Sequence, residues 1–106
     1  MNSNEAAWLA GLFEGEGCIS QRNSHSVRIN ISMTDADVVE RCKSLTGVGW
    51  MSTPYTKGAY KTMYVWNVDR AVDVDMVLRL LIPWFGTRRR ERAEWALQRL
   101  AGGRSL

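Results

Sequence analysis

The chain has 106 residues, of which 45% are hydrophobic and 24% charged, values that are typical of one folded domain and exclude a disordered chain. No segment approaches the roughly 20 apolar residues that cross a bilayer, and the first residues do not resemble a secretory signal. We therefore expect no membrane partner and a cytoplasmic protein, associated with the nucleoid in a prokaryote or phage-infected cell, or located in an organelle or nucleus according to its host. The formal net charge of +3 is compatible with a polyanionic partner such as nucleic acid. Cys18 and Cys42 lack the paired spacing of a zinc site, which predicts reduced, buried thiols.

The first half of the sequence predicts a helix, a two-stranded hairpin and a second helix. Apolar residues recur at helical spacing over residues 5–16, and Gly17 ends this helix. Residues 18–22 and 27–33 predict strands, and apolar and polar residues alternate throughout the second one. A helix over residues 34–47 follows.

The second half predicts another hairpin and two further helices. These elements are strands over 48–54 and 60–68 and helices over 71–82 and 87–100. Residues 102–106 are predicted to be a frayed tail of the single domain formed by residues 1–106. The order α-β-β-α-β-β-α-α predicts an α+β fold with a four-stranded antiparallel, saddle-like sheet that carries all of its helices on one face. The other face is then open to solvent or to a ligand.

Two acidic residues stand at the end of the first predicted helix, where the helix dipole is negative. Glu14 and Glu16 should each cost about a few tenths of a kcal/mol there, whereas Lys or Arg would be stabilising. Hard divalent cations take oxygen ligands and reverse the local charge balance. The sequence therefore predicts that these acids, on a turn with Gly15 and Gly17, bind a metal ion.

The polar face of the predicted sheet carries side chains suited to reading DNA. Arg28, Asn30 and Ser32 point to this face, and Arg and Asn make bidentate contacts to guanine and adenine in the major groove. Any half-exposed strand also has a polar face, so the alternation is compatible with a solvated surface. Arginines cluster at the start of the last helix from Arg88 onward, for which a solvated helical turn is the alternative interpretation. Of the five tryptophans, Trp50 is expected on the open face and the others in packing contacts.

Residues 9–17 read Leu-Ala-Gly-Leu-Phe-Glu-Gly-Glu-Gly and resemble the signature helix of the LAGLIDADG homing endonucleases. The resemblance extends over nearly the whole chain, through the order of elements, Gly47-Val48-Gly49 before the third strand, and Pro83-Trp84-Phe85 followed by basic residues. It implies a metal-dependent phosphodiesterase that makes a staggered double-strand break across the minor groove of a long, pseudo-palindromic site. Such an activity serves intron or intein mobility.

The resemblance also implies roles for individual residues. It assigns the catalytic metal, Mg²⁺ or Mn²⁺, to Glu16 with Gly15 beside it, and it implies no small-molecule cofactor. Arg88 is implied to lie near the scissile phosphate and Asn30 among the residues that order the active-site water. Arg88 stands where Lys is more usual, which keeps the positive charge but not a readily lost proton.

Small residues on the signature helix predict a close helix–helix contact. Gly11 and Gly15 lie on one helix face and let a second helix approach more closely than the usual separation of about 8–10 Å. Because the signature occurs once, the expected partner is the same helix of a second copy, in a two-fold homodimer whose interface includes Gly11, Gly15 and Ala7. A tight contact inside the monomer is the alternative.

The predicted ligand is double-stranded DNA, with the sheet of each protomer on one half-site. The candidate DNA-facing residues are Ser20, Arg22, Arg28, Asn30, Ser32, Ser52, Lys57, Lys61 and Asn67. Two other classes of function remain open: a catalytically inactive protein of the same fold that regulates transcription or assists RNA splicing, and a small interaction protein unrelated to nucleic acid. Metal-dependent cleavage and steep salt dependence of binding distinguish the three classes.

Overall fold

A computed structural model describes residues 1–58 and 61–104, except for the side chains of residues 57, 103 and 104. Its elements are α1 (Ser3–Glu16), β1 (Gly17–Gln21), β2 (Val27–Met33), α2 (Ala36–Thr46), β3 (Trp50–Met51), β4 (Tyr55–Lys57), β5 (Lys61–Val68), α3 (Ala71–Leu81), the 3-10 helix η1 (Ile82–Trp84) and α4 (Thr87–Arg104). The α+β fold and the order of its helices and hairpins are as the sequence predicts.

The sheet is antiparallel and has the order β1-β2-β5-β3, with β4 also paired to β5. The strand predicted over residues 48–54 is therefore wrong as a single element: β3 and β4 are two short strands that pair with the same neighbour. Gly49 has a φ of 88°, a left-handed conformation, so β3 begins only at Trp50, and Pro54, which lacks an N–H to donate, stands in the gap between β3 and β4. The fourth strand of the sheet is thus interrupted.

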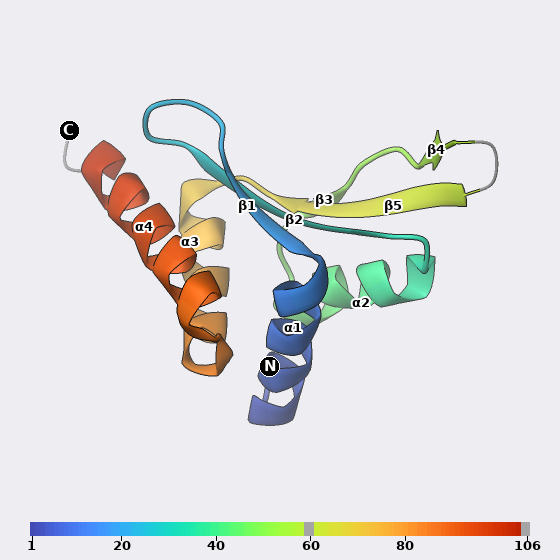
Figure 1. Ribbon diagram of the computed structural model, residues 1–106, viewed down its shortest axis with the longest axis horizontal. Coiled ribbons are helices and arrows are strands. Elements are labelled where there is room, and N and C mark those ends of the chain that lie inside the picture. The colour runs from blue at the N-terminus through green and yellow to red at the C-terminus, as the bar shows by residue number, and fades with distance from the viewer. Residues whose placement is uncertain (59–60, 105–106) are drawn as a thin grey trace.

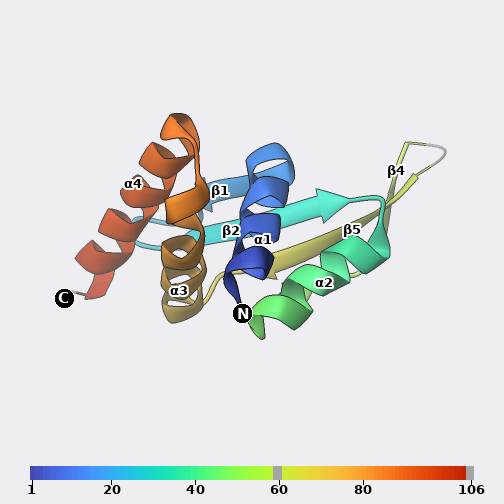
Figure 2. The same cartoon turned by 90° about the horizontal axis from the view of Figure 1, so that it is seen from below.

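All of the helices lie on one face of the sheet, as predicted (Figure 1). The view from below shows α1 to α4 covering this face, with the strands behind them (Figure 2). The core between the two layers is apolar: Leu9 and Phe13 of α1 and Ile29, Ile31 and Trp66 of the sheet are fully buried. No helix among the described residues has both the length and the hydropathy of a bilayer-spanning segment.

Two local features fix the ends of α1. Asn2 and Glu5 form a reciprocal cap, in which each side chain accepts a hydrogen bond from the other's backbone N–H (2.8 and 2.9 Å), so the helix begins at Ser3 and not at Glu5. At the other end, a Cβ on Gly17 would lie 2.5 Å from the ring of Phe13, so only glycine fits. The chain passes directly from α1 into β1, which places Glu16 at the junction.

Three predictions about single residues or segments are corrected by the structure. Helix α4 continues to Arg104, so residues 102–104 are helical and not a frayed tail; residues 105 and 106 lie outside the described part of the chain. Trp84 is 49% exposed and is not a packing residue, whereas Trp50 is exposed on the open face as expected. Cys18 is exposed, and only Cys42 is the buried thiol that was predicted for both. Burial raises the pKa of Cys42 to about 11.

Candidate active site and nucleic-acid interface

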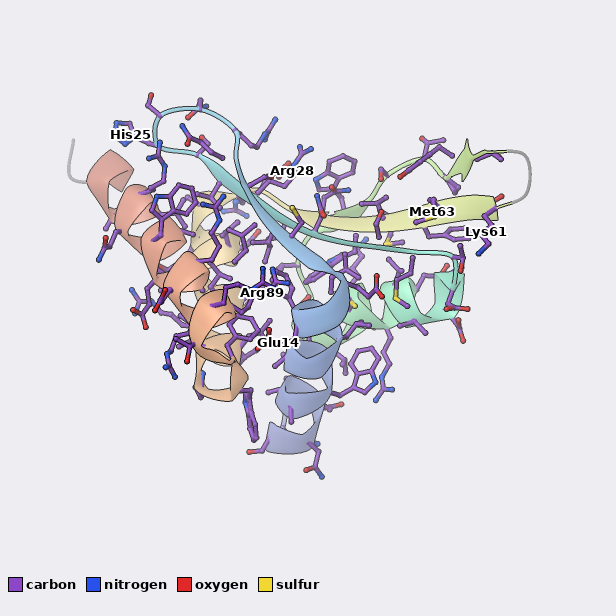
Figure 3. All side chains as sticks on the ribbon, viewed as in Figure 1. Glu14, His25, Arg28, Lys61, Met63 and Arg89 are labelled. Atoms are coloured by element: carbon purple, nitrogen blue, oxygen red, sulfur yellow. The ribbon has the colours of Figure 1, made fainter. Side chains whose placement is uncertain are left out.

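The two glutamates at the end of α1 have different environments. A carboxylate oxygen of Glu14 accepts a hydrogen bond from the backbone N–H of Gly86 (2.5 Å), just before α4, and the other lies 3.7 Å from Nε of Arg89. Arg89 also donates to the backbone carbonyl oxygens of Glu14 (3.0 Å) and Gly17 (3.1 Å), and its side chain lies between α1 and α4 (Figure 3). Its positive charge meets the negative end of the α1 dipole. The prediction that Glu14 is a metal ligand is therefore wrong, because its carboxylate joins α1 to α4.

Glu16, in contrast, is exposed and has no hydrogen-bond or ion-pair partner among the described residues. Its carboxylate and the backbone carbonyl of the neighbouring, exposed Gly15 are oxygen donors of the kind that Mg²⁺ and Mn²⁺ prefer. Within residues 1–58 and 61–104, no group of three or more His, Cys, Asp or Glu side chains could hold a metal ion. The donor set of one chain thus fits part of a divalent-cation site, to be completed by oxygens from water, phosphate or a second copy.

A basic cavity of about 390 Å³ lies between β1 and the start of α4. Its walls are formed by Gly17, Cys18, Ile19, Arg88, Arg89 and Arg92. Arg88 is exposed and makes no hydrogen bond or ion pair within the described part of the chain, so its guanidinium is available to an anion. The solvated-turn interpretation holds for Arg90, which is exposed and lies 4.0 Å from Glu94. The cavity begins at the residue that follows Glu16.

Two further arginines attach α4 to the first hairpin. Arg92 donates from Nε and Nη2 to the carbonyl of Ile19 (3.3 and 3.0 Å), and Arg99 donates to the carbonyl of Ser24 (2.5 Å). Both guanidinium groups lie over the ring of Trp95, at 3.8 and 5.1 Å from its centroid. The sequence alone does not predict this role, because the carbonyl acceptors are distant along the chain. We call the following set the α4 seam: Arg89, Arg92 and Arg99 with the carbonyls of Gly17, Ile19 and Ser24.

Asn30 connects the cavity to the open face of the sheet. Asn30 pairs with Cys18 of β1 on one side and with Asn67 of β5 on the other. Cys18 lines the cavity. The structure thus places Glu16, Arg88 and Asn30, the three predicted catalytic residues, around the same end of β1. Their catalytic roles stay predictions.

On the open face, a single carboxylate gathers three donors. Oδ2 of Asp69 accepts hydrogen bonds from Arg28 (2.8 Å), Arg22 (3.3 Å) and Nε1 of Trp50 (3.3 Å), and the guanidinium of Arg28 lies 5.5 Å from the centroid of the Trp50 ring. Arg28 lies on the side of the sheet opposite the helices (Figure 3). Burial acts to raise the pKa of Asp69, but the hydrogen bonds from Arg28 and Trp50 and the charges of both arginines hold it below its ordinary value. We call these four residues the Asp69 cluster.

Asp69 was missed in the sequence, although a signal was present. It follows the last strand and continues the alternation that places Asn67 on the open face. The consequence for Arg22 and Arg28 is that both predicted DNA-facing arginines are already paired within the protein.

The remaining DNA-facing candidates differ in availability. Asn67, predicted to face DNA, is only 4% exposed and donates to Oγ of Ser52 (3.3 Å), so its side chain is engaged within the protein. Ser20 donates weakly to the carbonyl of Arg28 (3.4 Å). Ser32 is half-buried on β2, and Lys61 is exposed at the start of β5. The side chain of Lys57 lies outside the described residues.

The glycines of α1 face open space. A Cβ placed on Gly11 or Gly15 would meet no atom within 4 Å, and both residues are exposed, while Ala7 is half-buried. Within the described residues, a tight contact inside the monomer therefore does not explain these glycines. They leave a narrow surface of small residues on α1.

Residues 3–93 match the model of the LAGLIDADG-like domain. The chain belongs to the LAGLIDADG-like family. This assignment confirms the family resemblance of residues 9–17 and covers all of the elements from α1 to the first part of α4. Among curated protein sequences, none matches this LAGLIDADG-like chain significantly.

Solved structures of homing endonucleases share the fold of this LAGLIDADG-like domain. They include I-CvuI in complex with its target in the presence of Ca (20% identity, TM-score 0.73, 92% of this chain and 68% of that chain). The archaeal intron-encoded I-Vdi141I complexed with DNA has 22% identity and a TM-score of 0.64 over 84% of this chain and 62% of that one. I-GzeII in complex with a DNA target has 19% identity and a TM-score of 0.73 over 99% of this chain and 39% of that one. The chain thus spans between 39% and 68% of these three neighbours, and at these identities the likeness is one of fold.

Proposed function

We propose that this LAGLIDADG-like domain is a site-specific DNA endonuclease that acts as a homodimer with a divalent metal ion. The observation that carries the proposal is the exposed, unpaired Glu16 beside a basic cavity with Arg88, at one end of an open polar sheet face. Structural neighbours that are homing endonucleases bound to DNA support a DNA endonuclease function. One of them, I-CvuI, was solved with Ca and also, with uncleaved DNA, with Mg, which supports the use of a divalent cation.

In the proposed mechanism, the carboxylate of Glu16 and the carbonyl of Gly15 would hold Mg²⁺ or Mn²⁺. Such an ion, when bound, activates water and neutralises charge on the phosphodiester. The guanidinium group of Arg88 stabilises the additional negative charge on the phosphate as water attacks. The amide of Asn30 orients the attacking water by hydrogen bonding. Two such sites, one for each DNA strand, would produce a staggered double-strand break.

Glu16→Gln tests the chemistry, because the amide keeps the shape of the side chain and removes the charge that a hard cation requires. Wild-type protein should cut members of a randomised duplex pool in Mg²⁺ or Mn²⁺, whereas Glu16→Gln should bind the selected duplexes without cutting them. The control is Glu40→Gln, which removes an exposed acid of α2 that does not line the basic cavity. Cleavage by Glu16→Gln at the wild-type rate would contradict the proposal. Binding without cleavage by the wild type would instead indicate the inactive, regulatory class.

The homodimer is proposed from the exposed glycines of α1. A single chain presents one Glu16, and two α1 helices that pack through Gly11 and Gly15 would bring two of these carboxylates together. Gly15→Leu should separate the protomers, as measured by analytical ultracentrifugation, and abolish double-strand cleavage. Gln98→Leu adds the same side chain to the exposed surface of α4 and should leave the dimer intact. A wild-type protein that is monomeric at micromolar concentration both free and on a duplex would contradict the shared active site.

A further inference from the structure

The Asp69 cluster combines negative and positive charge on the face that is proposed to bind a polyanion. One carboxylate oxygen of Asp69, Oδ2, accepts hydrogen bonds from Arg22, Arg28 and Trp50. The other, Oδ1, accepts no hydrogen bond from the described part of the chain. Its side chain is 23% exposed, and that of Arg28 is 27% exposed. The carboxylate and the guanidinium group are therefore adjacent and both side chains are partly exposed, but Nε of Arg28 is buried, which leaves the two Nη atoms as its donors toward a ligand.

An acid in this position weakens attraction to phosphates, so simple electrostatic binding does not explain it. Asp69 instead restricts the conformation of the Arg28 side chain. Arg28 is held between the carboxylate of Asp69 and the ring of Trp50, so it loses less side-chain freedom when a ligand binds. The free oxygen of Asp69 adds an acceptor next to that donor.

A G·C base pair presents the complementary pattern in the major groove. The amino group of cytosine is a donor to Asp or Glu, and O6 and N7 of guanine are acceptors for Arg. In an A·T base pair the purine has only one major-groove acceptor, N7, beside an amino donor, so it cannot accept both hydrogen bonds of an Arg, and phosphates offer no donor to a carboxylate.

We propose that Asp69 is a specificity-determining residue, which positions Arg28 and, with it, reads one G·C base pair in each half-site. The inference rests on the proposed DNA-binding function and extends it to the sequence that is preferred. It also predicts that Asp69 reduces binding to unrelated DNA, because it occupies Arg22 and Arg28 when no matching base pair is present.

The test compares wild type with Asp69→Asn on duplexes that the wild type selects from a randomised pool and on a scrambled duplex of the same composition. Loss of the carboxylate charge should lower the ratio of the two affinities by at least about fivefold, the lower end for a bidentate base contact. Binding to the scrambled duplex should tighten. The slope of log K against log salt should steepen by about one to two units, as Arg22 and Arg28 become free for phosphates. A merely structural role for Asp69 would not change this slope.

Three further variants complete the test. Glu40→Gln changes the net charge equally on the helical side of the sheet and should leave the affinity ratio unchanged. In an Arg28→Ala background, Asp69→Asn should have much less effect on the ratio, because its partner in base reading is gone. Asp69→Ser, which removes the carboxylate without adding an amide donor, should lower the affinity ratio as Asp69→Asn does, with each protein measured below its melting temperature.

The outcomes separate this inference from the proposed function. Selected duplexes that share a G·C pair in each half-site, with weaker preference for it in Asp69→Asn, support the inference. Wild-type selectivity and salt slope retained in Asp69→Asn overturn it and leave the endonuclease proposal intact. A wild-type protein that binds no duplex overturns both.

Discussion

Arginine has different roles in the α4 seam and in the Asp69 cluster. In the α4 seam, Arg89, Arg92 and Arg99 donate to backbone carbonyl oxygens, whose positions are fixed by the elements that carry them. In the Asp69 cluster, Arg22 and Arg28 donate to a side-chain carboxylate on an open surface, which a ligand can approach. The number of arginines in the sequence therefore does not measure the strength of DNA binding. The kind of acceptor separates an arginine that joins elements from one that is available to a ligand.

The largest expected effect on stability comes from Arg89→Ala. This substitution removes two hydrogen bonds to carbonyls at the end of α1 and the ion pair with Glu14, and we expect a loss of about 2–4 kcal/mol in the free energy of unfolding, measured by urea denaturation. Its neighbour Arg88, which has no such partners, is the matched control: Arg88→Ala should change the unfolding free energy by less than about 0.5 kcal/mol and abolish DNA cleavage. Equal stability losses for the two variants would remove the distinction between seam and ligand-facing arginines.

A smaller effect is expected at the two glutamates that end α1. Glu14→Gln weakens the interactions with Arg89 and Gly86 and should cost about 1 kcal/mol, seen as a lower melting temperature. Glu16→Gln removes an unpaired charge from the negative end of the dipole and should leave the melting temperature equal or slightly higher. A lower melting temperature for Glu16→Gln than for Glu14→Gln would contradict the assignment of Glu14 to structure and Glu16 to the ligand.

The smallest effect is the pH dependence contributed by the Asp69 cluster. The folded-state pKa of Asp69 is lowered below its unfolded value, so its contribution to stability is present above about pH 4, the ordinary pKa of Asp, and is lost as the pH falls through the folded-state pKa. The difference in unfolding free energy between wild type and Asp69→Asn should therefore shrink between pH 6 and the acid range. A difference that stays constant with falling pH would show that Asp69 is not charge-paired in solution.

Local patterns were enough to predict the layers of the fold but not the contacts between them. The alternation over residues 27–33 correctly predicted one apolar and one polar sheet face, and Gly17 and Gly47 correctly predicted two helix ends. The same reasoning failed at Glu14, because its partner Arg89 stands 75 residues later in the chain and the spacing of residues carries no information about that contact.

In the candidate site, too, residues with local sequence signals were predicted, whereas contacts between distant parts of the chain were not. Glu16 and Arg88 were predicted from the signature and from the position of Pro83, both of which are local in the sequence. Asp69 was not, because its significance arises only when the hairpin that carries Arg22 and Arg28 lies beside the end of β5. Asn67 was overestimated for a related reason: its strand position places it on the open face, but Ser52 and the neighbouring strands bury it.

The arginines of α4 also have a consequence for association between molecules. β1 is at the edge of the sheet, and unpaired carbonyls on an edge strand are a template on which a strand of another chain can add. Arg89 and Arg92 donate to the carbonyls of Gly17 and Ile19, so both carbonyls already have partners and the two arginine side chains obstruct an incoming strand there. At the opposite edge, β3 and β4 are too short and too interrupted to serve as a template. The domain can thus present a broad uncovered sheet to its ligand without polymerising through the edges of that sheet.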